Sequence, residues 1–151
     1  MKLWLTALLF AAATPALAQV STQVQVAGEV QHELVLDVEK LRRGVVVQER
    51  GYGGVRLIDL LKEAQIREDA RFALRRTYVV ATATDGFQAV FSWGELFNTP
   101  IGRGVLIAFE RDGAPLRDGE GKIALVSLAD ERPGTRHVKW LSRIEVRRVS
   151  E

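Results

Sequence analysis

Residues 45–65 read VVVQERGYGGVRLIDLLKEAQ, and within this stretch the pattern changes from that of a strand to that of a helix. The valines at 45–47 predict a buried strand, and the glycines within residues 51–54 predict a loop, because glycine adopts backbone angles that other residues avoid. Four apolar residues then recur at the i, i+3, i+4, i+7 spacing of one helix face: Leu57, Leu60, Leu61 and Ala64. We therefore expect a helix from Arg56 to about Gln65.

The segment before this stretch predicts a strand pair and a short helix. Residues 23–30 alternate valine with polar side chains, which is typical of a half-buried strand, and residues 34–36 are placed to pair back on it. Asp37 is expected to cap a helix that runs to about Arg43, because aspartate accepts hydrogen bonds from free helix N–H groups.

The segment after it predicts more strands. Residues 77–82 and 87–91 flank Asp85-Gly86, a dipeptide typical of tight hairpins. Ser92 and Glu95 form a capping box that predicts a helix through Phe97, with Trp93 and Phe97 in the core. Residues 98–104 are expected to form a loop, and three further strands are expected at 105–110, 122–128 and 143–149. Many short strands with few short helices predict one domain of the α+β or mostly β class, and we favour α+β.

The composition excludes several classes of protein. Met1-Lys2, the apolar run to Ala13 and the Ala16-Leu17-Ala18 triplet predict a cleaved signal peptide at residues 1–18 and a single domain at 19–151, because the apolar run is far shorter than the roughly 20 residues that span a bilayer. The chain has no cysteine, so no disulfide framework is expected. Its 21 Lys and Arg are interspersed with 19 Asp and Glu, which argues against a nucleic-acid partner.

Four segments resemble, in their order, the sulfite-oxidase-like domain, also called the oxidoreductase molybdopterin-binding domain: residues 54–61, 84–87, 108–116 and 138–146. The resemblance implies mixed β-sheets with short helices. Members of that family hold molybdenum by two pterin dithiolene sulfurs and one cysteine thiolate, a soft ligand suited to the metal. The matching region, residues 47–52, offers only the hard carboxylate of Glu49. Molybdenum cofactor and sulfite-oxidase chemistry are therefore not expected, and we favour a non-enzymatic role.

A smaller group within this family carries a Leu-Val-x-x-x-Asp-x-Arg-Pro segment, which residues 125–133 resemble. These are exported, cysteine-free, single-domain proteins that bind free pterins and signal to a membrane partner. Many of them place tryptophan beside the next arginine, whereas His137 follows Arg136 here. The resemblance implies a periplasmic protein for a tetrahydropterin or neopterin-like ligand, with a membrane-anchored cyclic-di-nucleotide (cyclic-di-GMP) cyclase or phosphodiesterase as its partner.

The chemistry of a pterin selects candidate residues for binding it. The 2-amino group and N3–H form a donor edge, which a carboxylate accepts in a bidentate pair, with these candidates: Asp85, Asp130 and Glu131. The acceptors O4 and N5 suit cations, with these candidates: Arg132, Arg136 and Lys139. The flat ring stacks on a planar side chain, with these candidates: Tyr52, His137 and Trp140. Removing such a carboxylate is expected to weaken binding and leave stability almost unchanged.

Each candidate also has a purely structural interpretation. Asp85 is equally expected as the first residue of the hairpin turn, Trp140 as a packing residue, and residues 130–132 as a solvated loop with weak ion pairs. The two histidines, His32 and His137, lie in different segments, and His32 is expected at the surface. Two other functions stay open: a molybdopterin oxidoreductase that holds its cofactor through the pterin alone, and an interaction module with an empty pocket.

Overall fold

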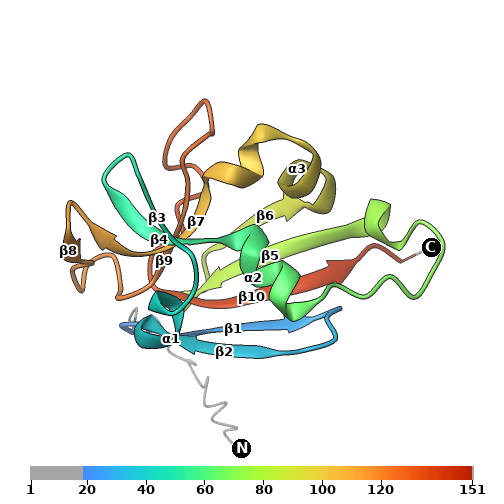
Figure 1. Cartoon of the computed structure of the whole chain (residues 1–151), viewed down its shortest axis with the longest axis horizontal. Coiled ribbons are helices and arrows are strands. Elements are labelled where there is room, and N and C mark those ends of the chain that lie inside the picture. The colour runs from blue at the N-terminus through green and yellow to red at the C-terminus, as the bar shows by residue number, and fades with distance from the viewer. Residues whose placement is uncertain (1–18, 151) are drawn as a thin grey trace, which may run out of the picture.

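Two β-sheets around one hydrophobic core form the framework of the computed structural model, which describes residues 19–150 (Figure 1). The predicted signal peptide lies outside the described residues. The first sheet has the order β2-β1-β10-β5-β6, with these bounds: β1 (Gln23–Gly28), β2 (Leu34–Asp37), β5 (Thr77–Ala83), β6 (Gln88–Ser92) and β10 (Leu141–Arg148). The last strand of the chain, β10, lies at the centre of this sheet, parallel to β1 and antiparallel to β5.

The second sheet is antiparallel and has the order β3-β4-β7-β8, with β9 also paired to β7. Its strands have these bounds: β3 (Val46–Glu49), β4 (Tyr52–Arg56), β7 (Val105–Arg111), β8 (Ala114–Pro115) and β9 (Ala124–Ser127). A small second cluster of buried side chains, centred on Leu106 and Val126, packs on this sheet and touches Tyr52 and Leu128. The mixed α+β architecture predicted from the sequence is confirmed.

Three α-helices and two 3₁₀ helices complete the fold: α1 (Val38–Arg42), α2 (Leu57–Ala64), η1 (Ala73–Arg76), α3 (Trp93–Asn98) and η2 (Pro100–Gly104). The predicted apolar face of α2 is buried and contacts strands of both sheets, so this helix belongs to the common core. Asp37 caps α1 as predicted, accepting a hydrogen bond from the Lys40 amide at 2.8 Å. No helix within residues 19–150 is long and apolar enough to cross a membrane.

For the opening stretch, the prediction of a buried strand was wrong and that of a glycine loop was only partly right. Val45 precedes β3 and is 69% exposed, and Val46 within β3 is 39% exposed because β3 is an edge strand of its sheet and not a buried one. The predicted glycine loop is reduced to the β3–β4 turn at Gly51, and Tyr52 to Gly54 belong instead to β4, between β3 and β7. A Cβ on Gly54 would lie 2.3 Å from the Ile107 carbonyl oxygen, so glycine is needed there for close approach of two strands.

Two smaller expectations also need correction. Residues 98–104 contain the 3₁₀ helix η2, which Thr99 caps by accepting a hydrogen bond from the Ile101 amide at 3.2 Å. Trp93 and Phe97 are only partly buried, and their rings stack on each other with centroids 5.2 Å apart. The Ser92 cap of α3 and the Asp85-Gly86 hairpin are confirmed.

Candidate functional site

The loop at residues 128–137 is the segment in which the sequence places most of its candidate ligands. Both ends of the loop are anchored, the Val138 end to strand β9 of the second sheet and the Leu128 end to η2. Leu125 and Val138 exchange two backbone hydrogen bonds of 2.9 Å, and the Leu128 amide donates to the Gly104 carbonyl at 2.8 Å. In Figure 1 the loop projects from the upper side of the molecule, to the left of α3. A segment fixed at both ends can hold side chains in place although it has no regular structure.

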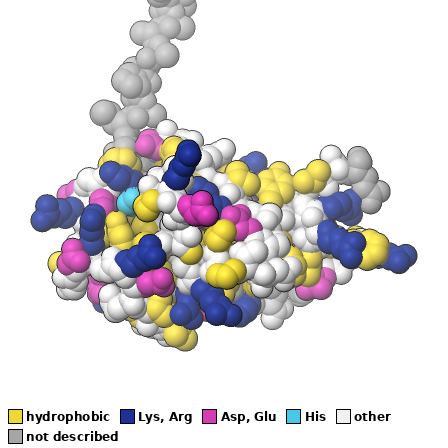
Figure 2. Space-filling model, turned by 90° about the horizontal axis from the view of Figure 1, so that it is seen from above, with side chains coloured by type: hydrophobic (Ala, Val, Ile, Leu, Met, Phe, Trp, Pro, Cys, Tyr) yellow, Lys and Arg dark blue, Asp and Glu magenta, His cyan; other side chains and the backbone are white. Residues whose placement is uncertain are grey.

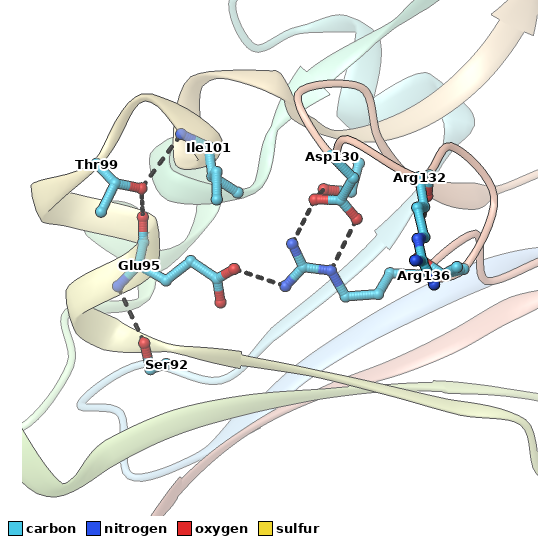
Figure 3. A network of polar contacts seen from close by, with 9 residues as sticks. Ser92, Glu95, Thr99, Ile101, Asp130, Arg132 and Arg136 are labelled. Atoms are coloured by element: carbon cyan, nitrogen blue, oxygen red, sulfur yellow. Dashed lines mark hydrogen bonds and ion pairs between the residues drawn. The ribbon is translucent and has the colours of Figure 1, made fainter.

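Asp130 and Arg136 from this loop form an ion-pair network with Glu95 of α3 (Figure 3). The Arg136 Nε donates to Asp130 Oδ2 at 2.9 Å, its Nη2 donates to Asp130 Oδ1, and its Nη1 donates to Glu95 Oε1 at 2.8 Å. The Ser127 hydroxyl donates to Asp130 Oδ1 at 2.8 Å. The network is therefore a bidentate pair with a third and a fourth group that restrain it.

Burial and charge set the ionisation of this pair. The side chain of Asp130 is 9% exposed and that of Arg136 is 21% exposed. Hydrogen bonds from Arg136 hold the pKa of Asp130 below its ordinary value, and the bond to Asp130 raises the pKa of Arg136. Both groups are charged over the whole physiological range.

The Arg136 guanidinium also covers an aromatic ring of the core. Its central carbon lies 4.2 Å from the centroid of the Phe91 ring, which is completely buried. One face of the guanidinium is therefore against the core, and its plane is fixed by the bonds to Asp130 and Glu95. The exposed part of Arg136 faces an open cleft.

This cleft has a volume of about 550 Å³ and lies between η2 and the 128–137 loop. Its lining residues come from these two segments: Thr99, Pro100, Ile101, Ala129, Asp130, Glu131, Arg132, Thr135 and Arg136. Within residues 19–150 the side chains of Glu131 and Arg132 form no hydrogen bond or ion pair, so both are free to meet a ligand. Figure 2 shows that acidic and basic side chains alternate over this face of the molecule.

His137 and Tyr52 lie apart from the cleft, although His137 directly follows Arg136. Their rings meet edge to face with centroids 6.2 Å apart, and the Arg111 guanidinium lies 5.2 Å from the Tyr52 centroid. Nε2 of His137 is buried and has no hydrogen-bond partner among the described residues. Burial lowers the pKa of His137, the charges of Lys139 and Arg111 lower it further, and Glu120 opposes them.

Three candidates remain. Within the described residues, no hydrogen bond, ion pair or ring contact joins them to the network around Arg136 or to the His137–Tyr52 pair. Asp85 has the turn role, since its Oδ1 accepts a hydrogen bond from the Phe87 amide at 2.9 Å. The Trp140 indole donates to the Asp118 carbonyl at 2.8 Å, which fixes the ring against the neighbouring turn. Lys139 is exposed, and it acts on His137 through its charge. The structure thus unites four predicted site residues: Asp130, Glu131, Arg132 and Arg136.

Sequence reasoning missed three contributors to the site. Glu95 was predicted as the second half of a capping box, but its carboxylate bonds Arg136 instead of the helix backbone. Phe91 and Ser127 were predicted only as strand residues, and they contact Arg136 and Asp130. Glu95 and Arg136 are 41 residues apart, and no local pattern connects such positions.

The region that matches the metal-binding segment of the resembled family forms the β3–β4 hairpin. Arg50 occupies its turn, and its Nη1 donates to the Leu128 carbonyl at 2.7 Å, so the hairpin is tied to the cleft loop. No thiolate exists anywhere in the chain, and residues 19–150 contain no group of three His, Asp or Glu placed to hold a metal. The residues present therefore do not fit a molybdenum centre ligated by the protein.

Comparison with solved structures supports the same fold. The chain is similar to a chain in the crystal structure of the sulfane dehydrogenase SoxCD from Paracoccus pantotrophus, with a TM-score of 0.65 and 20% sequence identity over 90% of this chain. This chain spans 41% of the length of that one. A search of curated protein sequences finds no match.

Comparison with family models gives a direct assignment. The model described as the oxidoreductase molybdopterin binding domain matches residues 43–151. This range includes the 128–137 loop and the His137–Tyr52 pair. The chain belongs to the oxidoreductase molybdopterin-binding domain family and lacks the cysteine that would bind molybdenum.

Proposed function

We propose that this protein binds a free pterin without molybdenum, in the cleft between η2 and the 128–137 loop. The observation that carries the proposal is the Arg136 guanidinium, which is held flat by Asp130 and Glu95, is backed by Phe91 and faces the cleft. A planar cation whose orientation is already fixed is a suitable surface for stacking a flat heterocycle. A volume of about 550 Å³ lies within the usual range for small-ligand sites.

The free side chains of the cleft match the two edges of a pterin. The Glu131 carboxylate is suited to accept the 2-amino and N3–H donors, and Arg132 is suited to donate to O4 or N5. Asp130 has a different role, because Arg136 and Ser127 already occupy both of its oxygens. Asp130 is a positioning residue for Arg136, and it acts on the ligand through the guanidinium.

The first test of the proposal is whether the purified protein carries a pterin and whether it carries molybdenum. Protein purified after export should release pterin on denaturation, measured by fluorescence, with no molybdenum detected by elemental analysis. Stoichiometric molybdenum would support the competing function, an oxidoreductase that holds its cofactor through the pterin alone. Absence of both, together with no binding of an added reduced pterin, would leave an interaction module.

Titration with a reduced pterin then locates the site. Glu131→Gln and Arg132→Ala each remove one charge-assisted contact and should lower affinity by roughly 10- to 100-fold. Glu39→Gln and Arg43→Ala make the same chemical changes on exposed residues of α1 and just after it, and should bind like the parent. If the cleft variants also bind like the parent, the pterin site is elsewhere.

The signalling role rests on resemblance to the exported pterin-binding group. In this proposal the protein is periplasmic, and its ligand state is sensed by a membrane-anchored cyclic-di-nucleotide cyclase or phosphodiesterase. Deleting the gene for this protein should make the cellular concentration of cyclic-di-GMP insensitive to pterin supply. The Arg132→Ala variant should fail to restore that sensitivity. Restoration by a variant that does not bind pterin would contradict the role of the ligand.

A further inference from the structure

An exposed aromatic ring with two arginines lies in the segment between α2 and β5. Phe72, just before η1, is 52% exposed. The guanidinium carbons of Arg71 and Arg75 lie 4.7 and 4.4 Å from the centre of its ring. Within residues 19–150 no carboxylate forms an ion pair with either arginine. The Phe72 tip, as we call residues 71–75, is therefore apolar at its centre and has two guanidiniums without ion-pair partners around it.

The backbone holds the Phe72 tip in place. Phe72 has a φ of 61°, in the left-handed region that aromatic residues rarely adopt. The segment is bonded to the end of β10, since the Val149 amide donates to the Arg76 carbonyl at 2.9 Å and Arg148 Nη2 donates to the Arg67 carbonyl at 2.7 Å. An uncommon backbone conformation fixed by neighbouring bonds keeps the ring in solvent, although burial in the core would stabilise it.

The Phe72 tip and the cleft proposed to bind pterin lie in different parts of the molecule. In Figure 1, η1 lies beside the C-terminal end of β10, away from the 128–137 loop. Figure 2 shows apolar side chains flanked by basic ones at the same end of the molecule. Val149, which is bonded to this segment, adds a second exposed apolar side chain, 57% exposed. Arg71, Phe72 and Arg75 are exposed, whereas Leu74 of the same segment is half-buried and lines a neighbouring cleft.

We infer that the Phe72 tip binds an anionic phospholipid surface. Two unpaired guanidiniums match lipid phosphates, and an aromatic ring between them suits the boundary between headgroups and acyl chains. A stable protein–protein interface needs about 800 Å² from each partner with matching shape, whereas a lipid surface adapts to a single protruding ring. The positive charge and the small exposed apolar area thus favour lipid over a protein partner, and the contact is weak and reversible.

Sedimentation with lipid vesicles tests this inference on the exported protein, independently of pterin binding. Vesicles that contain phosphatidylglycerol should bind the parent at low salt, and pure phosphatidylcholine vesicles should not. Arg71→Gln with Arg75→Gln should weaken binding by roughly 30-fold, and high salt should have a similar effect. Phe72→Asn should weaken it by roughly fivefold, and asparagine tolerates the left-handed backbone, so folding is preserved.

Matched controls keep the result interpretable. Arg43→Gln with Arg117→Gln removes the same charge from elsewhere, and Phe87→Asn removes another exposed ring, 45% exposed, so both should bind like the parent. Any contribution from residues 1–18 is common to all variants, so differences between them report on the tip. Equal binding by parent and tip variants, equal binding to neutral vesicles, or no binding to anionic vesicles would overturn the inference.

Discussion

Arg136 and His137 are adjacent in the chain, yet the fold treats their charges in opposite ways. Arg136 is bonded to Asp130 and Glu95, and its charge is stabilised. His137 is half-buried with an unpartnered Nε2 near Lys139 and Arg111, and its neutral form is favoured. The comparison shows that one loop can stabilise the charge of one side chain with carboxylate partners and, at the next residue, disfavour a charge by burial. Four predictions test this contrast.

The largest effect is expected from Arg136→Ala. The change leaves the Asp130 carboxylate without its main partner, frees Glu95 and uncovers Phe91. We expect the free energy of unfolding to fall by about 2–4 kcal/mol, below the full cost for a completely buried pair because Arg136 is partly exposed. Urea denaturation measures this value. Arg132→Ala, on an exposed neighbour, should change stability by less than about 0.5 kcal/mol, and equal effects of the two would contradict the network.

Asp130→Asn should cost about 1.5–3 kcal/mol at neutral pH, because it removes charge-assisted bonds. This revises the sequence-based expectation that stability stays almost unchanged. The pKa of Asp130 is lowered from 3.8, so its contribution is fully present above that value and is lost as pH falls through the lower folded pKa. The unfolding curves of variant and parent should therefore converge in strong acid. A constant gap between them at every pH would show that charge is not responsible.

The contribution of His137 should appear in a higher pH window and be smaller. Because burial lowers its folded pKa from 6.5, the unfolded chain takes up a proton first as pH falls, so stability decreases below about pH 6.5. We expect a loss of about 1 kcal/mol or less, measured as a shift of the urea midpoint. His137→Gln should remove this dependence of stability on pH. The loss of stability in strong acid, which is due to Asp130, should remain. An unchanged slope would place the titrating group elsewhere.

The smallest effect is expected from Lys139→Met, which removes one nearby positive charge. The pKa of His137 should rise, since the Lys139 charge is one cause of its lowering, and the loss of stability below about pH 6.5 should become smaller because the folded pKa lies closer to the unfolded one. An NMR titration of the His137 ring protons measures the shift directly. Lys62→Met on α2 is the matched control and should leave that titration unchanged.

The sequence predicted those features whose cause is local. The buried face of α2, the cap by Asp37 and the Asp85-Gly86 hairpin depend on residues within a few positions of each other, and all three are confirmed. The glycines of β4 were misinterpreted because their role is set by Ile107, which is distant in sequence. The Glu95–Arg136 bond was missed for the same reason. Resemblance located the cleft loop, but it did not show that Asp130 binds Arg136.

The position of β10 has a consequence for how the chain folds. Arg143 of β10 bonds Gln25 of β1, which is 118 residues away, and β10 also pairs with β5. The first sheet thus lacks its central strand until the last part of the chain has been synthesised. Hairpins such as β3–β4 and β5–β6 need only local contacts. Closing so long a loop is entropically costly and slows folding. The first sheet should therefore remain unclosed until synthesis of the chain is almost finished, even where local hairpins have already formed.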